Sequence, residues 1–198
     1  MQVAAGQHEH PNGDNRLAEL ARAGSVDAFN ALVLHYQDLA YNVAYRLLGD
    51  PDAAADAVQE GFISAWQHIG SFRGGAFRAW LLRIVTNGCY DALRRRQRRP
   101  AASLDDLADG EVGFDPPDPA DSPDRLVLRR ESIAAIQRAL LELPLDQRTA
   151  VVLYDVQGLS YDEIAEIGGV SLGTVKSRIS RGRAKLRGLL GNPRELLA

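Results

Sequence analysis

Apolar residues recur at steps of three and four along most of this chain, and no stretch alternates apolar with polar residues. The clearest stripe consists of Val26, Phe29, Val33, Tyr36, Ala40, Val43 and Leu47. Steps of three and four place side chains on one face of an α-helix, whereas a half-buried strand needs a period of two. The sequence therefore predicts an all-α protein.

Capping residues divide this pattern into separate helices. Asp50 and Pro51 are typical of an N-cap and the first helical position. They open a helix that is predicted to bury Ala55, Val58, Phe62, Ala65, Trp66 and Ile69. The next helix is predicted from about Phe77 to Arg96. These helices form the first part of the chain.

A segment rich in prolines and acids interrupts the helical pattern at residues 100–123. From Ala101 to Asp124 there are eight acids and no Lys or Arg. Such a composition cannot bury enough apolar surface to order itself, so it predicts a flexible linker. The linker separates two small helical domains, at 15–99 and 124–191. Residues 1–14 are polar and are expected to be disordered.

The second domain has the pattern of a helix-turn-helix. An apolar stripe of Ile133, Ile136, Leu140 and Leu143 precedes a short helix at 146–156. Ser160 and Glu163 then form a capping box, and Gly168-Gly169 turns the chain. A last helix runs from Leu172, capped by Ser171, to about Leu190. A short helix, a tight turn and a longer basic helix are typical of DNA-binding proteins.

Charge is sorted along the chain, although the net charge is only −3. From Leu47 to Phe72 there are four acids and no Lys or Arg, and from Arg73 to Arg99 there are eight arginines and one acid. From Ser171 to Gly191 there are six bases and no acid. Blocks of one sign are either solvated helix faces or surfaces for a partner of opposite sign. Two basic blocks separated by an acidic spacer favour the second interpretation.

Composition excludes several classes of protein. The single cysteine, Cys89, rules out an internal disulfide framework. No apolar run approaches the roughly 20 residues that span a bilayer, so we expect a cytoplasmic, reduced protein without membrane insertion. His8 and His10 flank Glu9 but lack a third metal ligand. No phosphate-binding loop or catalytic constellation is present, so the chain is predicted not to be an enzyme and to need no metal or cofactor.

The last helix carries a strip of mostly small residues opposite its apolar face. The strip consists of Gly173, Ser177, Ser180, Arg181 and Ala184. Small side chains let a helix backbone approach base edges, and Arg181 can pair with guanine through two hydrogen bonds. Cations flank the strip on both sides: Lys176, Arg183 and Arg187 on one, Arg178 and Lys185 on the other. Flanking cations suit the phosphates that line a major groove.

A second polar stripe follows the helix predicted from about Phe77. Its members are Trp80, Arg83, Asn87, Tyr90 and Arg94. Aromatic, amide and guanidinium groups suit unstacked bases and a phosphate backbone. We interpret Trp80 as a core residue, and Arg83, Asn87 and Arg94 as nucleic-acid contacts.

Several motifs, in this order, resemble the extracytoplasmic-function (ECF) sigma factors, the subunits that give bacterial RNA polymerase its promoter specificity. The resemblance covers about residues 25–99 and 123–190. It depends on the residues Asp56-Ala57-Val58-Gln59-Glu60-Gly61-Phe62, Leu143-Pro144 with Gln147-Arg148, Gly158 to Ala165, and Gly173-Thr174-Val175-Lys176-Ser177-Arg178.

The resemblance implies partners and roles for particular residues. The first domain is expected to bind core RNA polymerase through Asp56, Gln59 and Glu60, and the −10 promoter element through Arg73, Arg83, Asn87 and Arg94. The last helix is expected to bind the −35 element through Thr174, Lys176, Ser177, Arg178, Ser180, Arg181 and Arg183. An anti-sigma factor is a further expected partner.

Two other classes of function compete with a sigma factor. An enzyme such as a serine recombinase also ends in a helix-turn-helix, but its catalytic domain needs strands, which this sequence does not predict. An autonomous transcriptional regulator would bind an operator as a dimer and would need no acidic docking helix. A gel shift with and without core polymerase distinguishes the regulator from the sigma factor.

Overall fold

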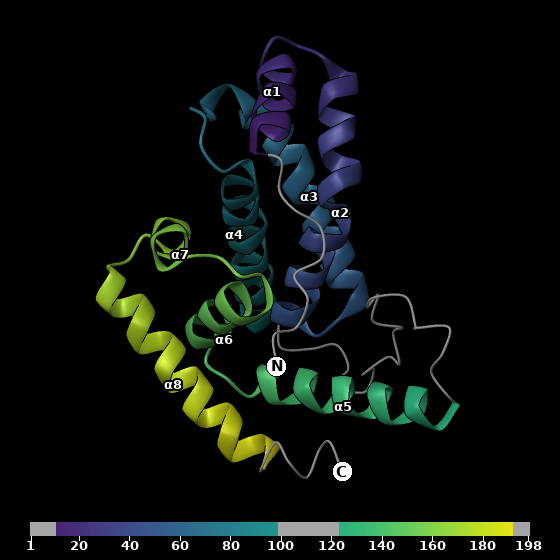
Figure 1. The fold of residues 1–198 in the computed structure, drawn as a ribbon, viewed down its shortest axis with the longest axis vertical. Coiled ribbons are helices and arrows are strands. Elements are labelled where there is room, and N and C mark those ends of the chain that lie inside the picture. The colour runs from purple at the N-terminus through teal and green to yellow at the C-terminus, as the bar shows by residue number, and fades with distance from the viewer. Residues whose placement is uncertain (1–10, 99–122, 192–198) are drawn as a thin grey trace.

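A computed structural model describes residues 11–98 and 123–191 of the chain, and these residues form helices and short connections without any strand (Figure 1). This confirms the predicted all-α class. The elements in chain order are α1 (Pro11–Arg22), α2 (Val26–Leu48), α3 (Pro51–His68), the 3₁₀ turn η1 (Ile69–Ser71), α4 (Phe77–Arg98), α5 (Pro123–Leu141), α6 (Leu145–Val151), the π-helical turn η2 (Val152–Val156), α7 (Tyr161–Gly168) and α8 (Leu172–Leu190).

Helices α1 to α4 form one bundle, which stands upright in Figure 1. Its core is the predicted apolar stripe of α2 packed between α3 and α4, with Leu32, Val43, Leu81 and Val85 fully buried. Asp50 caps α3 as predicted, because its carboxylate accepts the Ala53 N–H at 3.0 Å. Burying this many apolar groups on a shared face is what holds helices of this length together in water.

Helix α1 overlaps the segment expected to be disordered. The structure differs from that expectation at residues 11–14, which are helical, while residues 1–10 lie outside the described part of the chain. The helix forms because Ala18 and Ala21 are buried against the bundle. Asp14 also accepts a hydrogen bond of 2.5 Å from the hydroxyl of Tyr36 on α2.

Two residues of the apolar stripes predicted for α2 and α3 lie on the surface. Val26 is exposed because it is the first residue of α2, at the end of the bundle. Ala55 is exposed, while Ala54 and Ala57 are buried in its place. A run of alanines does not indicate which face of a helix is buried, because its members have the same side chain. At the start of α3 the sequence therefore predicted Ala55 as buried, whereas Ala54 is the buried residue.

Helices α5 to α8 form the second group, which includes the predicted helix-turn-helix. The expected helix at 146–156 divides into α6 and the π-helical turn η2, and Gly158 ends it with a φ of 67°. Helix α8 crosses α6 at Gly182, where an added Cβ would lie 2.6 Å from Val151 Cγ2. The close approach of these two helices therefore requires glycine at position 182.

The two groups of helices pack against each other, with α7 against α4 and α5 against α2. Figure 1 shows α6 and α7 beside α4, and α5 across the lower end of α2. The predicted linker at 100–123 lies outside the described residues except for Pro123, which begins α5. Within the described ranges, no helix is both long and apolar enough to cross a bilayer.

Candidate nucleic-acid and polymerase interfaces

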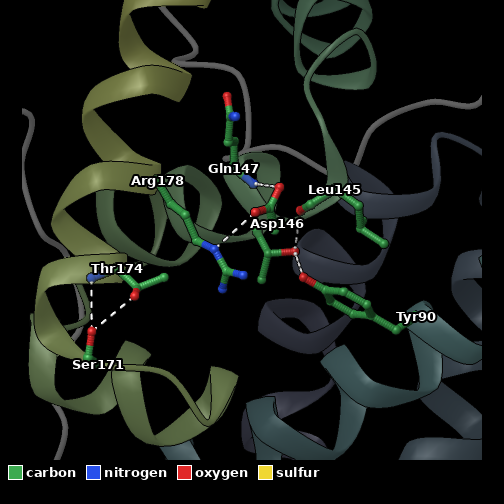
Figure 2. Close-up of polar contacts among 8 residues, drawn as sticks. Tyr90, Leu145, Asp146, Gln147, Ser171, Thr174 and Arg178 are labelled. Atoms are coloured by element: carbon green, nitrogen blue, oxygen red, sulfur yellow. Dashed lines mark hydrogen bonds and ion pairs between the residues drawn. The ribbon is translucent and has the colours of Figure 1, made fainter.

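The turn between α7 and α8 has the geometry that the sequence predicts for a helix-turn-helix. The Ser160 hydroxyl oxygen accepts the Glu163 N–H, and the Glu163 carboxylate accepts the Ser160 N–H at 2.8 Å, which completes the capping box. Gly169 ends α7 in the left-handed conformation with a φ of 60°. Ser171 then caps α8 by accepting the Thr174 N–H at 3.2 Å (Figure 2). The direction of α8 is thus set by local hydrogen bonds at both sides of the turn.

The apolar face of α8 is buried at its centre, where Val175 and Ile179 pack into the second group of helices. Leu172, the first residue of α8, is exposed at the start of the helix. On the opposite side, Gly173, Ser180, Arg181 and Ala184 are exposed and Ser177 is half-buried, so the predicted strip of small residues lies on the surface. A helix with this exposed strip can bring its backbone close to base edges in a major groove.

Arg181 lies within the strip and extends from it without an ion pair or hydrogen bond among the residues that the structure describes. Its guanidinium keeps all its donors for a ligand, because Arg carries five N–H groups and no acceptor. Lys176, beside the strip, lies with its Nζ 5.7 Å from the ring centre of Tyr161. Both cations remain accessible to a nucleic acid.

The other two arginines proposed for duplex contacts are already paired within the second group. Arg178 Nε lies 3.0 Å from Asp146 Oδ2, and Figure 2 shows the arginine reaching from α8 towards α6. Arg183 donates to Asp155 through Nε at 3.0 Å, and its hydrogen bond to that carboxylate raises the pKa of the guanidinium. These pairs fasten α8 to α6 and η2, so either arginine must share its donors to reach a phosphate.

A pair of stacked tyrosines beside α8 was not found by the sequence analysis. Tyr154 and Tyr161 are nearly parallel, with ring centres 4.8 Å apart, and Arg183 lies 5.0 Å from the centre of Tyr154. The hydrogen bond with Tyr161 is the main cause that raises the pKa of Tyr154. In the sequence, the only signal for this contact is that the two tyrosines are seven residues apart, with Gly158 between them. The two rings therefore make cation–π contacts with Lys176 and Arg183 of α8.

The residues proposed for the −10 element lie along one side of α4 and in the loop before it. Arg83, Asn87 and Arg94 are exposed, and Arg94 Nη1 lies 3.5 Å from Asp91 in a surface ion pair. Arg73 is exposed beside Gly74 and Gly75, which have φ values of 87° and 96°. The sequence assignment of Trp80 to the core agrees with its position, because the ring is half-buried against Phe72 and Phe77.

Tyr90 belongs to the same stripe of α4 but reaches the second group of helices. Its hydroxyl donates to Thr149 Oγ1 at 3.2 Å, and Thr149 in turn donates to the Leu145 carbonyl at 2.8 Å (Figure 2). Asn87 and Arg94 line a cavity of about 470 Å³ that is closed on its other side by α6, α7 and α8. Arg178 lines the same cavity, so the two groups of proposed DNA contacts meet at one place.

The acidic face of α3 is exposed. Asp56, Gln59 and Glu60 all point to solvent, and Glu60 makes one contact of 3.4 Å with Arg95, in which both side chains are more than 60% exposed. An ion pair of this kind contributes little to stability, so the carboxylates remain available. Ile63, which is 51% exposed on the same face, was not predicted from the sequence as part of this surface. Its spacing of three and four from Glu60 and Gln59 was the signal.

Neither a metal site nor a reactive cysteine is found among the described residues of the two groups of helices. Among the described residues, no three His, Cys, Asp or Glu side chains are placed to hold a metal ion, and His8 and His10 lie outside this part of the chain. Burial of the Cys89 thiol raises its pKa to about 12, which keeps it protonated and unreactive. The interfaces above are therefore the features that a function must explain.

Comparisons with known proteins match both groups of helices. The family model for Sigma-70 region 2 matches residues 32–99, and that for Sigma-70, region 4 matches residues 133–186. The RNA polymerase sigma-H factor of Pseudomonas aeruginosa is 39% identical over 175 residues, which cover 86% of this chain and 90% of that protein. The ECF RNA polymerase sigma factor SigE of Mycolicibacterium smegmatis is 37% identical over 182 residues, 92% of this chain and 69% of that protein.

A solved structure shares the arrangement of helices. It contains the sigma factor RpoE in complex with the anti-sigma factor NepR from Bartonella quintana. The TM-score is 0.65 at 31% sequence identity, and the match covers 83% of this chain and 98% of that one.

Proposed function

This chain belongs to the extracytoplasmic-function sigma factors of the sigma-70 family, and we propose how its surfaces divide the work of promoter-specific transcription initiation. We assign α1 to α4 to region 2, whose family model matches residues 32–99, and α5 to α8 to region 4, whose family model matches residues 133–186. As a sigma factor, the chain binds core RNA polymerase and promoter DNA. Sigma factors are not enzymes, and we place this one in the cytoplasm with the polymerase.

The polymerase-binding surface is the exposed acidic face of α3. Asp56 and Glu60 are four residues apart and carry like charges, an arrangement that slightly destabilises an isolated helix. Neither forms a strong ion pair within the described residues, so a basic partner can offset the repulsion. Ile63 adds an apolar group among these polar side chains, which is typical of the centre of a protein–protein interface.

The promoter-binding surfaces are α4, with the loop before it, and α8. Arg73, Arg83, Asn87 and Arg94 have the exposure and chemistry to bind the −10 element as separated strands. Lys176, Ser180 and Arg181 have the exposure to contact the −35 element as duplex, with Arg181 at base edges. Ser177 lies within the strip, and Thr174, Arg178 and Arg183 lie beside it as phosphate contacts.

The observation that carries this proposal is the presence, in one chain, of an exposed acidic helix face and an exposed basic recognition helix. In vitro transcription with core polymerase tests it. Asp56→Arg combined with Glu60→Arg should leave the fold intact and strongly weaken polymerase binding and transcript yield. Glu19→Arg combined with Asp38→Arg makes the same charge change at exposed positions of α1 and α2 and should have little effect. Equal losses in both double variants would refute the docking assignment.

An anti-sigma factor is the third proposed partner. The RpoE relative is in complex with one, and this chain has the same arrangement of helices. Affinity purification from the native cell should recover a second protein besides polymerase. Recovery of polymerase alone, under conditions where the factor is inactive, would contradict this assignment.

A further inference from the structure

The cavity between α4 and region 4 has a polar wall and a largely apolar wall. The wall on α4 consists of polar side chains: Thr86, Asn87, Tyr90, Asp91 and Arg94. The wall on region 4 includes five aliphatic side chains: Leu153, Ile164, Ile167, Val170 and Val175. The volume of about 470 Å³ lies within the range of roughly 300–1,000 Å³ that is typical of small-molecule sites. A ligand that fits both walls needs an apolar body and a few polar groups.

Arg178 lines this cavity from α8 with hydrogen-bond donors that no described residue accepts. Its Nε lies 3.0 Å from Asp146 Oδ2, whereas its two Nη groups have no hydrogen bond or ion pair within the described ranges. Figure 2 shows both Nη atoms pointing away from Asp146, into the space between α8 and Tyr90. The free end of a guanidinium offers two parallel N–H groups, which bind both oxygens of one carboxylate.

Thr86, on the opposite wall, carries a buried hydroxyl without a hydrogen-bond partner among the described residues. Only 3% of this residue is exposed, and its Oγ1 is unsatisfied. The other two hydroxyl groups of the cavity are paired, because Tyr90 donates to Thr149 Oγ1 at 3.2 Å and Thr149 donates to a backbone carbonyl. Since buried polar groups are normally hydrogen-bonded, the Thr86 hydroxyl indicates a place for a second polar group of a ligand.

The charges around the cavity limit the charge of its ligand. Arg178 is balanced by Asp146, and Arg94 Nη1 lies 3.5 Å from Asp91 Oδ1, so the lining is neutral overall. A single carboxylate adds one negative charge, which the free end of Arg178 compensates. A second negative charge would face the two aspartates without a cation of its own. The lining therefore favours a monoanion over a phosphate dianion.

We infer that this cavity is a binding site for a small aromatic monocarboxylate with a hydroxyl group at the far end of its ring. The carboxylate binds the Nη groups of Arg178, the ring packs between Tyr90 and the aliphatic wall, and the hydroxyl pairs with Thr86. The simplest such molecule is 4-hydroxybenzoate. Because its carboxylate takes the donors of Arg178, the ligand acts against binding of duplex DNA, a consequence that rests on the phosphate contact proposed for Arg178.

Titration of the full free chain with 4-hydroxybenzoate, followed by calorimetry and methyl NMR, tests the site. The methyl signals of Ile164 and Val175 should shift on binding, while that of Ile63 on α3 should not. Arg178→Ala should weaken binding by about tenfold or more, because it removes a bidentate charged contact. Arg187→Ala makes the same change at an exposed position of α8 and should leave binding unchanged. The neutral 4-hydroxybenzamide should bind the parent chain about tenfold more weakly or less.

Thr86→Val tests the far end of the site with little change of shape. It should weaken binding of 4-hydroxybenzoate by about threefold or more and leave binding of benzoate, which has no hydroxyl, unchanged. Thr174→Val, outside the cavity, should change neither. If Arg178→Ala does not fold, Arg178→Lys keeps the charge beside Asp146 but loses the parallel donors, and it should weaken binding in the same way. No binding by the parent chain, or equal binding by the Arg178 and Arg187 variants, would overturn the inference.

Competition with DNA separates this inference from the proposed function. Saturating 4-hydroxybenzoate should weaken binding of a −35 duplex by the parent chain, and it should have no effect on Arg178→Ala. A ligand that binds at the cavity and leaves duplex binding unchanged would refute the phosphate contact of Arg178 and still support the site. A ligand that weakens duplex binding equally in Arg178→Ala acts elsewhere, which would overturn the inference.

Discussion

Replacing Arg181 by alanine should weaken recognition of one position in the −35 element. The guanidinium is exposed in the centre of the small-residue strip and has no ion pair to give up within the described residues. Removing a bidentate contact between Arg181 and guanine should therefore cost the whole of its contribution to the binding free energy, about 1–3 kcal/mol. At about 1.4 kcal/mol per factor of ten, this corresponds to a loss of roughly 5- to 150-fold at the preferred base pair.

Arg178→Ala is expected to behave differently because Arg178 is already engaged. Its Nε lies 3.0 Å from Asp146 Oδ2, and its side chain is only 28% exposed. A partly exposed pair of this kind is worth about 0–1 kcal/mol, which offsets part of any phosphate contact. The loss on removing it should be below about tenfold, equal for all sequences, and accompanied by a decrease of about one in the salt slope.

The assay is holoenzyme binding to a library of −35 variants at several salt concentrations. Arg138→Ala, an exposed arginine on α5, is the matched control and should leave the profile unchanged. Asp146→Asn should strengthen binding of all sequences slightly, because it releases Arg178. Identical profiles for Arg181→Ala and Arg178→Ala would refute the division into base and phosphate contacts.

Three further predictions concern α8, the cysteine and the linker. Gly182→Ala should lower the free energy of unfolding of region 4 by about 1–2 kcal/mol, because the added Cβ would lie 2.6 Å from Val151 Cγ2. Gly188→Ala, where the added Cβ meets no atom within 4 Å, should be neutral or stabilising. Equal changes in the urea midpoint of the two variants would contradict the packing argument. Cys89 should not react with a thiol reagent at pH 8 until the chain is unfolded, because burial raises the pKa of its thiol to about 12. Rapid reaction of the native protein would contradict the burial of Cys89. Deleting residues 104–119 leaves a linker with a maximal reach of roughly 25 Å at ~3.5 Å per residue, so the two regions should no longer bind both promoter elements at once and transcription should fail. Replacing residues 104–119 by a Gly/Ser tract of the same length should retain much more transcription than the deletion. Normal transcription by the deletion variant would refute a two-site tether.

Helix ends were the most predictable part of this fold, because their causes are local. Asp50, Ser160 and Ser171 each accept a backbone N–H three residues ahead, as their positions before apolar runs predict. The surface strip of α8 was predictable for the same reason, since a regular helix fixes which side chains share a face. The buried register of α3 was less predictable at its start, where Ala54 and Ala55 differ in burial but not in chemistry.

The contact between the two regions could not be predicted from the pattern of apolar residues. Ile136, expected in the core, is 38% exposed, whereas its polar neighbour Gln137 is buried. The partner of Gln137 is the Tyr45 carbonyl at the end of α2, and Arg148 donates to one carbonyl of α2 and two at the α5–α6 connection. A carbonyl has no residue type that a sequence could reveal. A buried amide or guanidinium needs such partners, because an unsatisfied polar group costs about 1–3 kcal/mol. The hydrogen bond of Gln137 therefore depends on α2 being in place, whereas Arg148 has two of its three acceptors at the α5–α6 connection.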